Sequence, residues 1–297
     1  MTEVLFDIAN TKAYGHVIIN SEDWHNPEPL VLTNLKGKII PTNITTAVGI
    51  NPAPAYRPLP FKVGDLIALS GLATRITSYL PFKLPDDPTI YSSTHLSQVI
   101  GYFVDNKVDY DNFIPIYDKV MFKPIEVKQS DFLYLSDDNL SVGVVVKTGD
   151  GGFNDDWDRV PMNFKLGDVV LVRDNVSTRV TLGQEDYYVV DDKFIMGKFE
   201  SEDKLNIEDL KLCEGVHLFE EYEDDTIEGS MLYKVPMGDE DDISQTYQNM
   251  LFKLVKSDEV PEGIYYINRI DTEYVKFKNK TYFVAKKDRI MAKRAEN

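Results

Sequence analysis

The sequence predicts an all-β protein built as three tandem small β-barrels. Short runs rich in β-branched and aromatic residues, such as VGVVVKTG and DYYVVDD, alternate with Gly, Pro, Asn and Asp, which is typical of small antiparallel barrels or sandwiches. One stretch occurs almost twice, as FKVGDLIALSGLATRIT at residues 61–77 and as FKLGDVVLVRDNVSTRVT at residues 164–181. Long helical periodicity is lacking, and only NIEDLKLC and ISQTYQNMLFKLV have a pattern that favours helix.

The two copies set the period of an internal repeat. Gly64 and Gly167 lie 103 residues apart, and a third, weaker copy follows at residues 260–264. An isoleucine of the closing segment recurs every 95 residues, at Ile100, Ile195 and Ile290. This period predicts three domains of ordinary size. Their expected bounds are 1–106, 107–204 and a divergent 205–297.

Each Gly-Asp pair is expected to make a tight turn into a hydrophobic strand, in which Gly adopts positive φ and Asp bonds its own backbone. Thr-Arg-(Ile/Val)-Thr then alternates faces at period two, and the closing strand returns to seal the barrel.

Composition excludes several classes of partner. The formal net charge of −17 would repel phosphate backbones, so we expect no nucleic-acid partner. No window approaches the roughly 18 apolar residues of a membrane helix, and the first residues lack a secretion signal, so we expect no membrane partner. The single cysteine, Cys213, fits a reducing compartment. The cytoplasm is therefore the expected location.

The sequence argues against an enzyme. The four histidines form no metal-binding spacing, and one cysteine excludes the usual thiolate metal sites. No nucleophile elbow, P-loop or dinucleotide fingerprint occurs. We therefore expect no catalytic residue, no metal and no cofactor.

Read as a whole, the second repeat resembles a subunit of the GroES-type co-chaperonin family. The order of its features carries the resemblance: an opening strand at Ile114 to Val120, a Gly-Val-Val-Val-Lys-Thr-Gly strand at 143–149, the Gly-Asp turn at 164–169 and a closing segment from Tyr188 to Gly197. The resemblance extends to the second half of the first repeat and to the last 35 residues of the third. It implies three GroES-like barrels in one chain. It also implies a roof hairpin, which the second repeat can build from residues 149–163 but for which the third has almost no room between Leu254 and Val260.

The resemblance also implies a function without chemistry. Co-chaperonins cap a GroEL-type chaperonin ring, and each subunit extends a loop with a short aliphatic tripeptide into a hydrophobic groove of the chaperonin. These loops order on binding and act together from one ring. Candidate segments for such loops follow the opening strand of every repeat. The alternative is that their apolar residues are ordinary strand residues that face the core. The candidate partner-binding residues are Leu30, Val31, Leu32, Phe132, Leu133, Leu135, Met231, Leu232 and Tyr233.

Two functions remain open at this point. The first is a co-chaperonin-like folding accessory whose partners are a chaperonin ring and further copies in a homo-oligomeric ring. The alternative is a structural or assembly protein, of the kind found in bacteriophage virions, that keeps the barrel as a ring-forming module. The family makes sevenfold rings, whereas chains of three barrels give multiples of three, and this mismatch weakens the first function. The Asn-, Asp- and Tyr-rich composition suits a bacteriophage or an AT-rich genome in either case.

Overall fold

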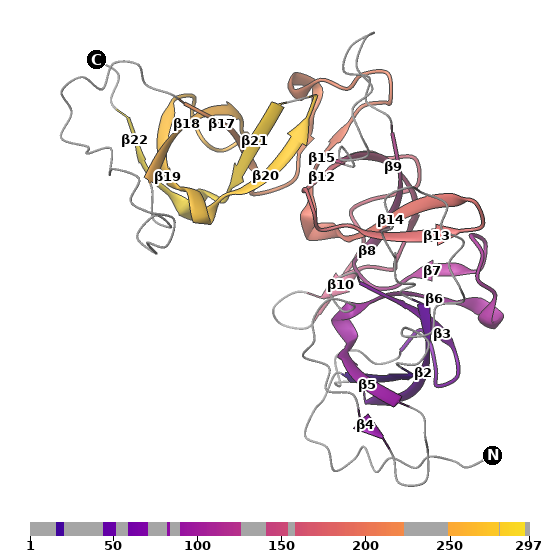
Figure 1. Cartoon of the computed structure of the whole chain (residues 1–297). Coiled ribbons are helices and arrows are strands. Elements are labelled where there is room, and N and C mark those ends of the chain that lie inside the picture. Colours follow the sequence, from indigo (N-terminus) through magenta and orange to yellow (C-terminus); the bar gives the residue numbers. More distant parts are fainter. Residues whose placement is uncertain are drawn as a thin grey trace, which may run out of the picture. The chain divides into compact units, whose positions relative to one another are not determined.

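The computed structural model is all-β in the part of the chain that it describes (Figure 1). Its regular elements there are antiparallel strands and single-turn 3-10 helices. No helix in this part is long and apolar enough to cross a membrane. The described residues are 16–20, 44–51, 59–70, 82–83, 90–125, 141–153, 158–222, 249–278 and 280–294.

The first large sheet runs in the order β4-β5-β1-β2-β3-β6-β7. All of it belongs to one compact unit of the chain, which comprises Met1–Lys123, Val145–Leu166 and Ser177–Asp192. Its strands are β1 (His16–Asn20), β2 (Ile44–Asn51), β3 (Leu66–Leu69), β4 (Phe82–Lys83), β5 (Ile90–His95), β6 (Val99–Phe103) and β7 (Phe113–Pro115).

The second large sheet runs in the order β13-β14-β8-β9-β12-β15-β16. A separate two-stranded hairpin, β10 with β11, lies in the chain between β9 and β12. The strands are β8 (Lys119–Pro124), β9 (Val142–Thr148), β10 (Gly152–Phe153), β11 (Arg159–Val160), β12 (Val169–Val172), β13 (Thr178–Leu182), β14 (Glu185–Asp191), β15 (Ile195–Phe199) and β16 (Lys211–Leu212).

The third large sheet runs in the order β20-β21-β17-β18-β19-β22. It belongs to the second compact unit, which comprises Pro124–Val144, Gly167–Val176 and Lys193–Asn297. Its strands are β17 (His217–Glu221), β18 (Asn249–Lys256), β19 (Ile264–Asn268), β20 (Glu273–Phe277), β21 (Lys280–Ala285) and β22 (Ile290–Lys293).

The three sheets share one strand order. In each, the opening strand (β1, β8 or β17) lies between the strand that follows it in the chain and the second strand of a later hairpin. The first two sheets gain a seventh strand from the chain that follows their closing strand: β7 pairs with β6, and β16 pairs with β15. Within the described residues, β22 has no such neighbour.

Each compact unit has its own hydrophobic cores. In the first unit, one cluster gathers around Ile67, Leu69 and Val99, and another joins Phe103 and Phe113 to the strands β8, β13 and β14. In the second unit, one cluster surrounds Leu171 and Leu210, and another fills the third sheet. Buried and exposed residues alternate along β13, so that every second side chain faces the core.

The structure corrects two expectations about secondary structure. The opening strand expected at Ile114 to Val120 is not continuous: β7 ends at Pro115, a turn follows at residues 117–118, and β8 begins at Lys119. The stretch ISQTYQNMLFKLV favours a helix, but its last seven residues belong to β18, which pairs with β17 on one side and β19 on the other. Phe252 and Leu254 are buried while Lys253 is exposed, which is the alternation of a strand. In NIEDLKLC, the helix is limited to the 3-10 turn Ile207–Asp209.

Candidate functional site

All nine candidate partner-binding residues lie outside the described residues. Their places in the chain are nevertheless equivalent with respect to the three sheets. Each group lies in the segment that joins the opening strand to its next neighbour, namely residues 21–43, 126–140 and 223–248. The strands on either side of each segment are neighbours in their sheet.

The described residues next to these segments are held together by the backbone. At the ends of segment 126–140, Ile125 N–H donates to the carbonyl of Val142 at 3.0 Å. Ser141 is buried, and its hydroxyl lies 2.6 Å from a carboxylate oxygen of Asp174. At segment 223–248, Tyr222 N–H donates to the carbonyl of Leu251 at 2.9 Å. The described residues at the two ends of each of these segments are therefore hydrogen-bonded across neighbouring strands.

The predicted Gly-Asp turns are confirmed in the first two sheets. Gly64 has φ of 94° and Gly167 has φ of 86°, a region that residues with a Cβ rarely adopt. In the first turn, Lys62 N–H donates to Asp65 Oδ2 at 2.9 Å, so the carboxylate bonds its own backbone as expected. These turns set the direction in which β3 and β12 enter their sheets.

The roof hairpin expected at residues 149–163 is present as β10 and β11. The guanidinium of Arg159 lies over the rings of Tyr117 and Phe153, at 5.2 and 4.7 Å from their centroids. It also pairs with Asp150 at 3.2 Å and donates to the carbonyl of Gly151. Cation–π and charged contacts thus fix the hairpin on the opening segment of the second repeat.

A buried charge lies at the start of β8. Lys119 is 4% exposed, and its ammonium contacts Asp118 at 2.9 Å and Asp191 at 2.8 Å. Burial alone would lower the pKa of Lys119, but the two carboxylates outweigh it and raise the pKa. The lysine therefore stays charged. The sequence placed Asp118 and Lys119 in a strand but did not predict this triad, because Asp191 comes from β14, distant in sequence.

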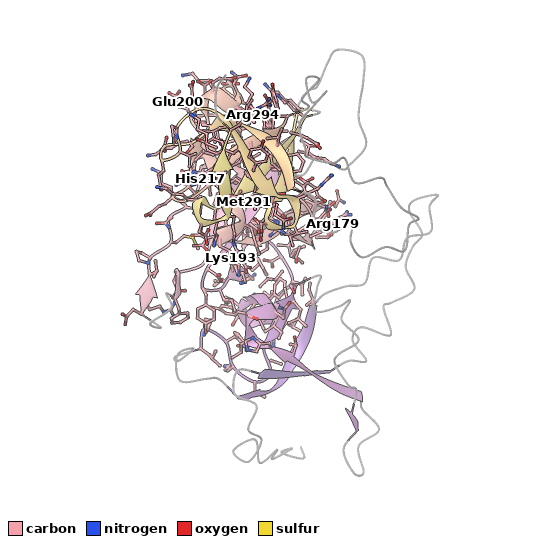
Figure 2. The ribbon with its side chains drawn as sticks, turned by 90° about the vertical axis from the view of Figure 1, so that its left-hand side faces the viewer. Arg179, Lys193, Glu200, His217, Met291 and Arg294 are labelled. Carbon is pink, nitrogen blue, oxygen red and sulfur yellow. The ribbon has the colours of Figure 1, made fainter. Side chains whose placement is uncertain are left out.

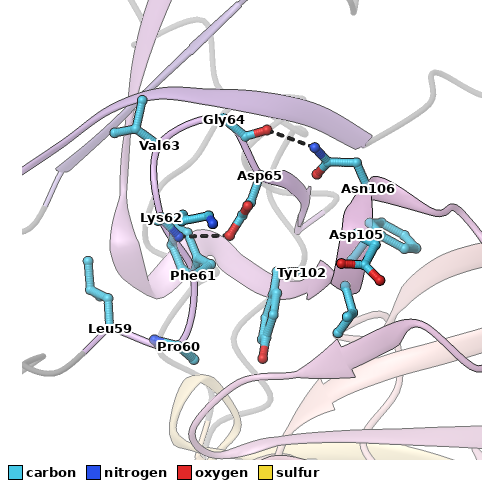
Figure 3. A pocket seen from close by; sticks show the side chains of 12 residues that line it. Leu59, Pro60, Phe61, Lys62, Val63, Gly64, Asp65, Tyr102, Asp105 and Asn106 are labelled. Carbon is cyan, nitrogen blue, oxygen red and sulfur yellow. Dashed lines mark hydrogen bonds between the residues drawn. The ribbon is translucent and has the colours of Figure 1, made fainter.

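A surface pocket of about 790 Å³ lies beside the Gly64 turn in the first unit (Figure 3). The Asn106 side chain closes one side of it, donating to the carbonyl of Gly64 at 3.0 Å and accepting from Leu66 N–H at 2.7 Å. Two aromatic rings, Phe61 and Tyr102, lie 6.2 Å apart. The pocket is lined by residues 59–65 and 102–106, and the sequence did not predict it.

Two of the described histidines contact a serine hydroxyl through Nδ1: His95 contacts Ser97 at 2.8 Å, and His217, labelled in Figure 2, contacts Ser257 at 2.9 Å. His217 is 1% exposed, and its buried Nε2 has no hydrogen-bond partner among the described residues. Burial lowers the pKa of His217, so the imidazole is kept neutral. Among the described residues, no group of three or more His, Cys, Asp and Glu side chains is placed to hold a metal ion.

Comparison with known proteins identifies the middle of the chain. Residues 112–199 match the family model described as Cpn10, the chaperonin 10 Kd subunit. The chain is 31% identical over 90 residues to the co-chaperonin GroES of Dinoroseobacter shibae, a match that spans 29% of this chain and 87% of the relative. It is 30% identical over 86 residues to the co-chaperonin GroES of Orientia tsutsugamushi, spanning 28% of this chain and 92% of the relative.

A eukaryotic relative matches to a similar extent. The mitochondrial 10 kDa chaperonin of Arabidopsis thaliana is 26% identical over 88 residues, which is 28% of this chain and 90% of that protein. The resemblance noted for the second repeat is thus confirmed for residues 112–199. Through that domain, the chain belongs to the chaperonin 10 Kd subunit family of GroES-type co-chaperonins.

Proposed function

We propose that the chain is a co-chaperonin-like folding accessory made of three tandem GroES-like barrels. The observation that carries this proposal is the common strand order of the three sheets around one that belongs to the co-chaperonin family. If the family function is retained, the chain acts by binding, without catalysis, and works in the cytoplasm. It caps a chaperonin ring and contacts it through the segments that follow β1, β8 and β17.

The apolar residues of these segments give the proposed contact its free energy. Each aliphatic side chain buried in a partner groove contributes about 1.5–3 kcal/mol before the cost of ordering the segment is subtracted. One segment alone therefore binds weakly. Three segments on one chain raise the effective concentration of the second and third contacts, so the whole chain binds far more tightly than any one segment.

Copies of the chain are also proposed to associate through β22. Ile100 on β6 and Met196 on β15 are 3% and 2% exposed, and both strands pair with a following strand. In the register of strand pairing, Met291 on β22, labelled in Figure 2, corresponds to Ile100 and Met196. Its side chain is 61% exposed. An apolar side chain beside an open strand edge favours pairing with another chain. Closure of such contacts into a ring would present several sets of segments together.

Substitution within the segments tests the proposed chaperonin contact. A triple variant with Leu32→Asp, Leu133→Asp and Leu232→Asp should lose co-sedimentation with a chaperonin in the presence of nucleotide, because a carboxylate would have to enter each apolar groove. Its melting temperature should stay close to that of the unmodified chain. Leu166→Asp is the matched control, since Leu166 is 69% exposed and lies outside the three segments.

The outcomes separate the two functions. A stable triple variant that still binds the chaperonin rejects the segments as the contact. An unmodified chain that shows no chaperonin binding at all, but assembles with itself, favours the structural or assembly function. A triple variant that unfolds shows that the segments are core strands, because a buried unpaired charge is strongly destabilising.

A further inference from the structure

The pocket beside the Gly64 turn occupies a position that recurs in all three sheets. On the closing strands, Tyr102 pairs with Ile67, Lys198 with Val170, and Lys293 with Tyr265. In each sheet, the strand that pairs with the closing strand is entered two residues before Ile67, Val170 or Tyr265. These entry residues are Asp65, Asp168 and Gly263.

In the second sheet this position holds a complete ion pair. The ammonium of Lys198 lies 2.7 Å from Asp168 Oδ2. The Asp168 side chain is only 11% exposed, so the lysine neutralises a largely buried carboxylate. The entry turn of the second sheet is thus built around a cation that the closing strand provides.

In the third sheet the lysine is kept and the carboxylate is lost. A Cβ added at Gly263 would lie 2.3 Å from Cε of Lys293, so the lysine chain passes directly over the entry residue. A lysine side chain thus extends from the closing strand to the strand entry in both the second sheet, with Lys198, and the third sheet, with Lys293. An ammonium group at this place is a recurrent feature of the fold in this chain.

In the first sheet the carboxylate is kept and the lysine is lost. Asp65 is present, but a tyrosine, Tyr102, replaces the lysine. Asp65 accepts a hydrogen bond from Lys62 N–H, and it takes part in no ion pair among the described residues. Burial raises the pKa of Tyr102, and the negative charges of Asp65 and Asp150 raise it further. The negative charge of Asp65 therefore reaches the position at which the second sheet has Lys198.

The lining of the pocket suits a cation that carries an apolar chain. Phe61 is buried at its inner side and, with Tyr102, offers aromatic surface to methylene groups and a ring face to a positive charge. Asp105 provides a second carboxylate at the pocket, visible beside Tyr102 in Figure 3. Lys62 also lines the pocket but is exposed to solvent. A volume of about 790 Å³ lies in the range of pockets that bind small ligands.

We infer that this pocket of the first unit binds an alkylammonium or guanidinium group, which takes the place that Lys198 occupies in the second sheet. The group can belong to a free amine or to a lysine or arginine side chain of a partner polypeptide. In both cases the cation contacts Asp65, and its methylene chain lies along Phe61 and Tyr102. This inference does not depend on binding to a chaperonin.

The test is a titration of the full chain with n-butylammonium and, separately, with a lysine-containing tripeptide, followed by NMR of backbone amides at constant ionic strength. Saturable shifts are expected at residues 61–66 and 102–106. Asp65→Asn, which can still accept from Lys62 N–H, should weaken binding at least tenfold. Tyr102→Lys should abolish it, because the new lysine fills the site as Lys198 does. Lys198→Tyr should create a second site in the second sheet.

The two titrations distinguish the source of the bound cation. Binding of the tripeptide but not of the small amine identifies a partner side chain, and the reverse identifies a free amine; both support the inference. Shifts spread over acidic residues without saturation, or unchanged by Asp65→Asn, would mean general attraction of cations by a chain of net charge −17 and would overturn it. If Tyr102→Lys does not fold, Asp65→Asn alone decides.

Discussion

Among single residues, Lys119 is a buried charge that two carboxylates neutralise. Lys119→Met would leave Asp118 and Asp191 without their shared cation. Removing one partner of a buried ion pair typically destabilises by about 3–5 kcal/mol, and the partial exposure of both carboxylates places the expected loss near the lower figure. Urea unfolding measures this loss.

A neighbouring lysine provides the control for that measurement. Lys123 pairs with Glu185 at 2.9 Å, but both side chains are about half exposed, so Lys123→Met should lose less than about 1 kcal/mol. Equal losses in the two variants would contradict the assignment of Lys119 as a buried structural charge.

His217 predicts a pH dependence for the third sheet. Burial holds the pKa of the folded imidazole below its ordinary value of 6.5; nearby Glu259 and Asp258 oppose this shift, and Lys287 adds to it. Above pH 6.5 both folded and unfolded states are neutral at this residue, so it has no effect. As pH falls below 6.5 the unfolded state binds the proton first, and stability falls by up to about 1.4 kcal/mol per pH unit.

Comparison with a variant isolates this effect from other titrations. The difference in unfolding free energy between the unmodified chain and His217→Phe should change between pH 7.5 and pH 5, in favour of the variant at the lower pH. A difference that is constant with pH would show that His217 titrates equally in the folded and unfolded states.

Among the elements, the closing strand β6 and strand β7 approach each other closely at Gly101. A Cβ at Gly101 on β6 would lie 2.4 Å from the ring of Phe113 and 2.8 Å from the carbonyl oxygen of Ile114. Gly101→Ala should therefore displace β7, at a cost of about 1–3 kcal/mol, and increase hydrogen exchange at Phe113. Ala292 holds the corresponding position on β22, so a chain that pairs there must lie farther from its strand than β7 does from β6.

The control is Gly183→Ala. No atom lies within 4 Å of a Cβ at Gly183, although its φ of 68° is unfavourable for alanine. This variant should lose stability through backbone strain alone. Hydrogen exchange at the Phe113 amide should increase only as much as the loss of global stability requires. If both variants expose Phe113 equally, the close approach at Gly101 has no special role.

The sequence predicts those elements that a few neighbouring residues specify. It does not predict features that depend on which strands pair and on the register of that pairing. The turns at Gly64 and Gly167 were predictable because glycine and aspartate specify them within five residues. Strand β18 was not, because pairing with β17 and β19 outweighs the helical tendency of its residues. The pocket needs Tyr102 opposite Ile67, two residues after Asp65, a relation that depends on which strands pair and in which register.

For the whole molecule, self-association is expected at β22, which pairs on one side only among the described residues. Sedimentation at micromolar concentration should show oligomers of the unmodified chain. Met291→Asp should dissociate them without lowering the melting temperature, because Met291 is exposed in the single chain. An unmodified chain that sediments as a monomer, or an oligomer that resists the substitution, would contradict the role of β22.

The chain contains a co-chaperonin domain at residues 112–199, and we propose that it caps a chaperonin ring. Single-particle imaging of the purified chain with a GroEL-type chaperonin and nucleotide would show this directly. We expect density over the end of the chaperonin ring, with contacts from the segments at residues 21–43, 126–140 and 223–248 to the apical grooves. Chaperonin rings that remain uncapped at saturating concentrations of the chain would contradict it.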